Sequence, residues 1–458
     1  MDIKGIKNNA INNLKSNYFN NIFVTFLITT VLGGQYIYST DKARFANYDK
    51  IIPAIGIYKS MMKFFYHGKI YDYLIILAYV TVLICFILFI KNVLGIGKIR
   101  YFLEERRYKK TRIDKILFPF RVKRGIHLAY VLFFKTLFQS LWNLTIIGGF
   151  IKRYEYLFIP YVLAENPNIS KKEAFRLSKE LTKGTKLKLF KLDLSLILYF
   201  LLSIITIKIS DILFFNSYYE CIIAETYMQL RKEKYKELTD KTLLNDKLLD
   251  ISKVKAEEYP VKKFSIKERR EFLNADYNRI YSIQNLILIF FTFTFIGYVY
   301  EVLLGLIRNG DLVNKGMMHG PWLPIYGIGG VLILILLEKF RDKPWQLFLL
   351  AFVVCGIVEY IGSWILDFFL NIKYWNYDTF ILNINGRICF EGLMVFGLGG
   401  VLFTYLLGPI LDNLYNKIKP KTKNIICAIL IAFFSIDYIA SCIHPNQGNG
   451  ITYFEKRD

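Results

Sequence analysis

The sequence is poor in the motifs from which soluble enzymes build familiar active sites. It has only four histidines, and it contains no GxxxxGK[ST] phosphate-binding loop, no HExxH zinc motif and no GxSxG nucleophile motif. GIGKIR at 95–100 lacks the glycine spacing and the hydroxyl residue of a phosphate-binding loop. These absences argue against a hydrolase or an ATPase built on known motifs. We therefore expect no catalytic residues and no cofactor.

Cysteine is also scarce, and none of the six cysteines belongs to a CxxC pair. All of them lie in apolar stretches, where cysteine commonly acts as a small packing residue. The pattern disfavours both a disulfide framework and a zinc site, so we expect no metal. The residues are Cys85, Cys221, Cys355, Cys389, Cys427 and Cys442.

Charged residues make up only 21% of the chain, against 54% hydrophobic residues, and the mean hydropathy is positive. The charge is one-sided, with 60 Lys and Arg against 37 Asp and Glu. The basic residues stand in short runs between long apolar stretches, as in the cytoplasmic loops of membrane proteins. This pattern indicates a lipid bilayer as the partner, and no motif points to nucleic acid.

Apolar runs long enough for membrane helices recur along the chain. They predict an all-α, polytopic integral membrane protein with about ten to eleven membrane segments in two membrane domains. Lys4, Lys7 and Lys15 precede the first run, which we expect to be an uncleaved span because no small-x-small cleavage site follows it. The predicted segments are 22–38, 73–94, 128–149, 187–207, 212–230, 283–307, 322–337, 345–370, 389–411 and 425–443, together with the shorter apolar run 154–163. Pro160 interrupts that short run, which reads either as the returning half of a kinked hairpin or as an interfacial helix.

Two polar regions set the expected domains and orientation. Residues 98–127 hold eleven Lys and Arg against three acids, which predicts a cytoplasmic loop. The mixed-charge stretch 232–281 reads as a cytoplasmic linker between a multi-pass domain at 1–231 and a permease-like domain at 282–443. Basic loops at 339–343 and 417–423 are then also cytoplasmic. We expect the N-terminus inside and the tail 444–458 outside a cytoplasmic membrane.

The segment 170–183 begins with a capping-box spacing at Ser170 and Glu173 and carries lysines around an apolar face. It reads either as a basic helix lying on the cytoplasmic leaflet or as an ordinary connector helix. The sequence leaves both alternatives open.

The second half contains a weak internal repeat. Tyr300 and Glu301 precede GIGGVLILILL at 327–337, and Glu359 and Tyr360 precede GLGGVLFTYLL at 397–407. Each unit would be one helix out and one helix back, which is a common way to build a membrane pathway at a repeat interface. Chance similarity between glycine-rich apolar helices is the alternative.

Ionisable residues inside predicted spans are costly and therefore mark candidate sites. In the second half they map to the outer part of the membrane, where converging side chains would form a polar vestibule for a cation, a proton or a polar headgroup. Interfacial positions and structural ion pairs are the alternative. The candidate binding residues are Glu301, Glu359, Glu391, Arg387, His319 and Asp437.

Residues 283–418 resemble the ABC-transporter type IV family, also called the CmpB-like permease family. The resemblance is carried by GYVYE at 297–301, NKG at 314–316, GPWLPIYG at 320–327, Glu359 with Tyr360 and Trp364, and NGRIC at 385–389. The resemblance implies a permease, without a defined substrate.

The first half is similar to a bacterial membrane family catalogued only as a protein of unknown function. That similarity is carried by PYVLAENPNIS at 160–170, then Ala174, Ser178, Lys183 with Gly184, and LFKLDLS at 189–195. It implies nothing beyond residence in a membrane.

These observations favour a permease component for a small solute or ion. Any ATPase would be a separate nucleotide-binding subunit. The sequence is also compatible with an oligomer. A non-transport scaffold or an envelope- or lipid-related factor is the alternative. A third hypothesis is a membrane-embedded enzyme that uses Glu359 with Arg387 or His319.

Overall fold

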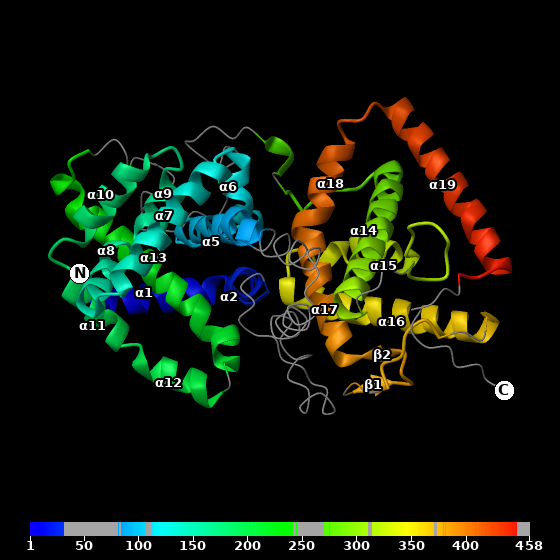
Figure 1. Cartoon of the computed structure of the whole chain (residues 1–458), viewed down its shortest axis with the longest axis horizontal. Helices are drawn as coiled ribbons and strands as arrows, with labels where there is room; N and C mark the ends of the chain where they lie inside the picture. Colours follow the sequence, from blue (N-terminus) through cyan, green and yellow to red (C-terminus); the bar gives the residue numbers. More distant parts are fainter. Residues whose placement is uncertain are drawn as a thin grey trace, which may run out of the picture. The chain divides into compact units, whose positions relative to one another are not determined.

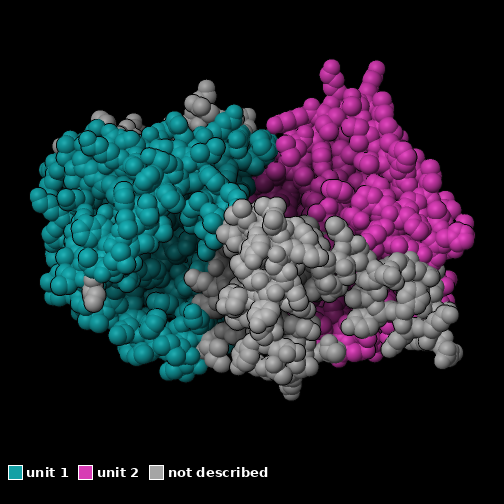
Figure 2. All heavy atoms as spheres, viewed as in Figure 1, with its two compact units in different colours: residues 1–37, 54–273 teal, residues 38–53, 274–458 magenta. Residues whose placement is uncertain are grey.

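The computed structural model divides the chain into two compact units, and each is described here by itself (Figure 2). The first unit holds the described residues up to Leu273, and the second holds those from Ala275 onward. The structure describes residues 1–31, 81, 84–106, 108, 111–206, 208–240, 244, 270–273, 275–309, 314–370, 373–378, 380 and 382–446. The predicted segment 73–94, the linker 232–281 and the tail 444–458 therefore lie partly outside the described residues.

Unit 1 is entirely helical apart from its turns and loops, within the part that the structure describes (Figure 1). Its α-helices are α1 (Ile3–Ser16), α2 (Tyr18–Thr25), α5 (Asn92–Glu105), α6 (Phe118–Arg121), α7 (Gly125–Asn143), α8 (Ile146–Glu155), α9 (Ile159–Glu165), α10 (Lys171–Thr182), α11 (Lys186–Leu194), α12 (Ile197–Ile205) and α13 (Asn216–Lys234). Short π- or 3₁₀-helical turns are η1 (Phe26–Val31), η4 (Ile87–Lys91), η5 (Ile113–Leu117), η6 (Asp211–Phe215), η7 (Tyr235–Glu237) and η10 (Glu271–Leu273).

The interior of unit 1 holds charged side chains. Glu104 of α5 lies between two cations, with its Oε1 2.6 Å from Arg100 Nε and its Oε2 3.3 Å from Lys115 Nζ. All three side chains are completely buried. A buried charge is tolerated only when a partner compensates for its lost hydration. These residues belong to the basic run that predicts a loop, and here they form helices packed inside the unit.

Helix α13 carries the acids that pair with other cations of the same run. Lys98 contacts Glu220 at 2.5 Å, and Arg106 contacts Glu225 at 2.5 Å. Glu165, at the end of α9, accepts hydrogen bonds from Arg231 and from the hydroxyl of Tyr227, the latter at 2.7 Å. These pairs tie α5, α9 and α13 together across large sequence separations.

Helix α10 begins with the predicted capping box. Ser170 Oγ accepts from the Glu173 amide, and the Glu173 carboxylate accepts from both the hydroxyl and the amide of Ser170. These bonds hold the pKa of Glu173 below its usual range. The apolar face of α10, with Ala174, Leu177 and Leu181, is fully buried in unit 1. This packing supports the connector-helix alternative over the membrane-surface one.

Unit 2 combines long helices with one small hairpin (Figure 1). Prolines stand at the first or second position of α15, α16, α18 and α19, where the fixed φ of proline suits a helix start. The elements are α14 (Ile283–Asn309), α15 (Pro324–Leu336), η11 (Glu338–Phe340), α16 (Pro344–Leu370), β1 (Asn383–Ile384), β2 (Ile388–Cys389), α17 (Phe390–Leu402), η12 (Phe403–Leu407), α18 (Gly408–Tyr415) and α19 (Pro420–Ile443).

Four helical stretches in the described residues are long and apolar enough to cross a membrane, and all four belong to unit 2. They are Ile283–Val302, Pro344–Phe369, Phe390–Tyr415 and Pro420–Ile443. Helix α15 is apolar but shorter. The helical class is confirmed, and the apolar helices identify a membrane protein. The prediction of ten to eleven spans is not confirmed.

Two of the predicted spans of the first half are interrupted by turns. The span 187–207 is divided by a turn at Ser195 and Leu196, which separates the short helices α11 and α12. Within this turn the Ser195 hydroxyl donates to the carbonyl of Leu192 at 2.7 Å. The span 128–149 ends as a helix at Asn143 and turns at Leu144 and Thr145. Hydropathy averaged over a window does not register such turns.

The two repeats of the second half pack in the same register. An added Cβ at Gly327 of α15 would lie 2.7 Å from the carbonyl oxygen of Phe290 on α14. An added Cβ at Gly397 of α17 would lie 3.2 Å from the carbonyl oxygen of Phe348 on α16. Each phenylalanine stands eleven residues before the glutamate of its own repeat, 290 before 301 and 348 before 359.

The next helical turn repeats the match. An added Cβ at Gly330 would lie 3.1 Å from the ring of Phe403 and 3.8 Å from that of Phe293, and one at Gly400 would lie 2.6 Å from Ala351. Phe293 and Ala351 both stand eight residues before their glutamate, 293 before 301 and 351 before 359. Chance similarity of sequence would not place matching glycines against matching positions of the partner helix. Matching glycines therefore pack against matching positions of the partner helix, as a repeat of helix hairpins predicts.

We expect Gly397→Ala to destabilise the full-length protein, because the new methyl group would lie 2.7 Å from the ring of Phe348. Overpacking of this kind costs roughly 1–3 kcal/mol. Gly399→Ala is the matched control, since an added Cβ there meets nothing within 4 Å. Thermal unfolding in detergent should show a lower melting temperature for Gly397→Ala and an unchanged or higher one for Gly399→Ala. Equal melting temperatures would contradict the packing described.

Candidate functional site

A glutamate from each repeat is held by a tyrosine hydroxyl. Tyr326, at the start of α15, donates a hydrogen bond to Glu301 Oε1 of α14 at 2.6 Å. Tyr377, in the loop before β1, donates to Glu359 Oε1 of α16 at 3.0 Å. Each hydroxyl fixes one carboxylate oxygen and leaves the other available. We call Glu301 and Glu359 the carboxylate pair.

The two carboxylates are neighbours. Glu301 lies close enough to Glu359 for the two groups to interact electrostatically, and Glu359 is only 5% exposed. The start of α15 crosses α16 at this level, with Ile325 against Gly362 at 3.7 Å and Gly329 against Cys355 at 3.6 Å, both measured from an added glycine Cβ. The first turns of α15 therefore bring the two repeats together beside the pair.

Arg387 lies farther along the same stripe of α16. Glu359, Ser363 and Asp367 are spaced four residues apart and are all buried. The guanidinium donates to Ser363 Oγ at 3.2 Å and to Asp367 Oδ2 at 2.5 Å. Arg387 follows a turn in which Asn385 and Gly386 have φ values of 54° and 64°, a left-handed conformation suited to Asn and Gly. The anionic partner of Arg387 is thus Asp367.

Cys389 lies between Glu391 and the carboxylate pair. Cys389 caps the N-terminus of α17 by accepting the amide of Gly392 at 3.4 Å. Its thiol lies within electrostatic reach of both Glu359 and Glu391. The first turn of α17 therefore adds a third carboxylate to this end of the helix hairpins.

His319 and Asp437 meet each other at a separate place. The carboxylate of Asp437 on α19 accepts the backbone amides of His319 at 3.2 Å and of Gly320 at 2.9 Å. The His319 ring nitrogen contacts the carbonyl oxygen of His444 at 2.8 Å. These contacts fasten the loop before α15 to α19. The six predicted residues thus divide into an acidic group with Glu301, Glu359 and Glu391, an ion pair at Arg387, and a loop anchor.

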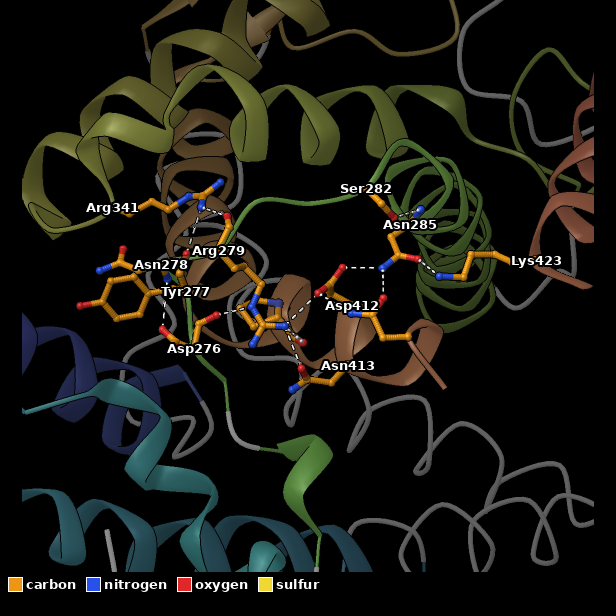
Figure 3. Close-up of polar contacts among 12 residues, drawn as sticks. Asp276, Tyr277, Asn278, Arg279, Ser282, Asn285, Arg341, Asp412, Asn413 and Lys423 are labelled. Carbon is orange, nitrogen blue, oxygen red and sulfur yellow. Dashed lines mark hydrogen bonds and ion pairs between the residues drawn. The ribbon is translucent and has the colours of Figure 1, made fainter. Parts of the chain in front are cut away.

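A second polar site, which the sequence analysis missed, surrounds Asn285 near the start of α14 (Figure 3). Its side-chain amide donates to Asp412 Oδ1 at 2.6 Å and to Asn416 Oδ1 at 2.8 Å. Its carbonyl oxygen accepts from Lys423 Nζ at 2.7 Å. Arg279 donates to Asp412 Oδ2 at 2.9 Å and completes this Asn285 cluster. The cluster joins α14, α18 and α19 to the segment that precedes α14.

Arg341 holds the same segment from the other side (Figure 3). This buried guanidinium donates to the carbonyl oxygens of Tyr277 at 3.0 Å, Arg279 at 2.6 Å and Leu334 at 2.6 Å. It also lies 5.4 Å from the ring centroid of Tyr281, and burial raises the pKa of that tyrosine. Backbone carbonyls at the end of α15 suit a cation there.

The sequence carries only a weak signal for these contacts. Asn285 is one polar residue near the start of an apolar run, and Arg341 and Lys423 belong to basic loops that predict solvent exposure. Their burial depends on helices distant in sequence. Among the residues that the structure describes, no three His, Cys, Asp or Glu side chains gather as ligands for a metal ion.

Comparison with known proteins assigns a family description to part of each unit. Residues 288–442 match the model of a family described as "Putative ABC-transporter type IV". Residues 143–234 match the model of a family described as "Protein of unknown function (DUF975)". No curated protein and no solved structure matches the chain. The two expected resemblances are confirmed, and the first match covers the carboxylate pair.

We expect Asp412→Asn to lower stability, because it removes the negative charge that Arg279 and Asn285 share inside unit 2. Loss of a buried charged hydrogen-bond acceptor costs about 1–3 kcal/mol. Asp342→Asn is the matched control, because Asp342 is exposed and accepts only a long 3.4 Å hydrogen bond from Asn278. Thermal unfolding in detergent should separate the two variants, and a similar loss in both would argue against a special role for the Asn285 cluster.

Proposed function

We propose that this protein is a membrane permease component that moves a small solute or an ion, with its transport pathway in the permease-like domain at 282–443. In this proposal the rest of the chain consists of a multi-pass domain at 1–231, a linker at 232–281 and a tail at 444–458. The main support is the carboxylate pair, which lies where two helix hairpins of matching register meet. Binding sites at repeat interfaces are common in transporters.

The chemistry of the pair favours a positively charged cargo or coupling ion. A carboxylate in a membrane-spanning helix is costly unless it is compensated. Tyr326 and Tyr377 supply hydrogen bonds to the pair but no positive charge. A cation or a proton bound between Glu301 and Glu359 would supply the missing compensation, and Glu391 would extend the acidic surface toward α17.

The repeat packing offers a way to open the site. The glycines of α15 and α17 bring each returning helix into direct contact with its outgoing partner. Each hairpin can therefore move as one body, and rocking of one hairpin against the other would change access to the carboxylate pair. Arg387 and Asp437 would keep the connecting loops attached during this motion through Asp367 and the backbone of His319 and Gly320.

The proposed setting is a cytoplasmic membrane, with the N-terminus and the linker inside and the C-terminus outside. The basic loops at 339–343 and 417–423 support this orientation through the positive-inside rule. Because the matched family is described as an ABC transporter, ATP is the energy source to consider. A separate nucleotide-binding subunit would then supply the hydrolysis and would dock on the cytoplasmic loops.

A non-transport scaffold or an envelope- or lipid-related factor is the alternative function. This alternative is favoured because several candidate residues already stabilise the fold. Arg387 is paired with Asp367, and Asp437 accepts hydrogen bonds from two backbone amides. In that case the carboxylate pair would be a packing feature, and its replacement would alter stability without altering any flux.

We expect the full-length protein in phosphatidylcholine and phosphatidylglycerol vesicles to dissipate an imposed gradient of protons, Na⁺ or K⁺ faster than empty vesicles. Glu359→Gln should reduce that flux at least about tenfold, since an amide cannot bind a proton or a cation as a carboxylate does. Glu301→Gln should act in the same direction. Fluorescent dyes sealed inside the vesicles measure each flux.

Glu338→Gln is the control for this experiment, because Glu338 is exposed in η11. Its flux should equal that of the unchanged protein. The amide of Glu359→Gln can still accept from Tyr377, so its melting temperature should change little. Unchanged flux in both variants of the carboxylate pair would contradict the proposed site, and no flux above empty vesicles would favour the scaffold alternative.

A further inference from the structure

Helices α7 and α8 of unit 1 form an antiparallel hairpin with an exposed apolar tip. The two helices are joined by Leu144 and Thr145, and they pack against each other. Leu144 is 82% exposed and Ile147 is 77% exposed. Further apolar side chains around the tip are also exposed, namely Leu137, Leu141, Trp142, Phe150 and Ile151. Such a patch needs an apolar partner.

The apolar tip carries no ionisable residue, although exposed apolar side chains continue past Lys135 on α7 at Phe133 and Tyr130. No ionisable residue occurs between 136 and 151, and this stretch is bounded by Lys135 on α7 and by Lys152 and Arg153 on α8. Each leg from these charges to Leu144 is eight or nine residues long, or about 12–14 Å at 1.5 Å per residue. The hydrocarbon core of a bilayer is about 30 Å thick, so each leg reaches less than half of it.

We propose that residues 136–151 form a re-entrant hairpin that enters a single lipid leaflet and anchors unit 1 to the bilayer. The tip lies among the acyl chains, and the exposed Arg153 at its base contacts the phosphate groups of anionic phospholipids. This arrangement replaces the complete span that the sequence predicts at 128–149, because the chain reverses at Leu144 before it can cross.

The turn is suited to a medium without water, where backbone polar groups need partners inside the protein. The amide of Leu144 donates to the carbonyl of Leu141 at 3.3 Å, and that of Thr145 donates to Trp142 at 3.0 Å. The Thr145 hydroxyl also donates to the carbonyl of Trp142 at 2.9 Å. The side-chain amide of Gln139 donates from Nε2 to the carbonyl of Gly149 at 3.1 Å and so links the two legs.

The base of the hairpin favours lipid over a protein partner. Arg153 keeps its side chain 64% exposed, and its contact with Asp193 is a long 3.5 Å. Lys152 is bound to Glu155 at 2.7 Å and lies 5.3 Å from the ring centroid of Trp142. Basic and aromatic side chains together are typical of a membrane interface. The four long apolar helices of the same chain already place it at a bilayer.

The test uses the full-length protein with the exposed cysteines removed by Cys85→Ala and Cys442→Ala. Ile126→Cys, nine residues before Lys135 on α7, and Arg153→Cys, at the base of the α8 leg, then place one thiol on each side of the tip, where both side chains are exposed. The protein is reconstituted in phosphatidylcholine and phosphatidylglycerol vesicles and treated with a membrane-impermeant maleimide. Intact-mass measurement counts the labels on each molecule. The count per molecule is therefore interpretable even when the protein inserts in both orientations.

A re-entrant hairpin places both thiols on one side, so each molecule should carry two labels or none. A complete span would place them on opposite sides, so that each molecule would carry one label, and that result would overturn the proposal.

A spin label at Leu144→Cys measures depth. We expect it to be accessible to oxygen and shielded from a water-soluble nickel complex, whereas a control label at the exposed Lys172→Cys on α10 should be accessible to nickel. Nickel access at position 144 would place the tip in water. Shielding from both reagents would place it against protein. Either result would overturn the proposal.

Discussion

Every charge that this chain takes out of water needs a partner, and the fold of both units depends on meeting that need. In unit 1, Glu104 is held between Arg100 and Lys115, and Glu165 receives Arg231. In unit 2, Asp412 receives Arg279 and Asp367 receives Arg387. Removing one member of such a pair is far more costly than the pair's net contribution to stability. Each pair therefore specifies which helices must lie together.

The carboxylate pair differs from these ion pairs in one respect that bears on function. Glu301 and Glu359 receive tyrosine hydroxyls, and the contacts described for them supply no cation. They come from equivalent positions of two hairpins, each packed through glycines that let backbone and side chain approach closely. A site with acidic groups from two repeats and an incomplete balance of charge is a reasonable place for a mobile cation. The nearby Arg387, in contrast, is balanced by Asp367.

Several features were predictable from sequence because they depend on local pattern. The capping box of α10 follows from the spacing of Ser170 and Glu173, and the apolar helices of unit 2 follow from hydropathy. The possible glycine repeat was visible as two similar stretches, and the contacts of Gly327 and Gly397 match between them. The division of 187–207 at Ser195 was not predictable from hydropathy, because the turn at 195–196 lies inside an apolar run that hydropathy averages over.

The sequence by itself determined the helical class, the membrane character of the second half, and which acidic residues there are candidate binding residues. These properties depend on composition and on periodicity within one helix, both of which are local. Only the tertiary structure decided that the basic run 98–124 supplies buried ion pairs, that Arg387 pairs with Asp367, and that Asn285 gathers Asp412 and Lys423. The physical reason is that the environment of a charge is set by its neighbours in space, and those neighbours come from helices far away along the chain.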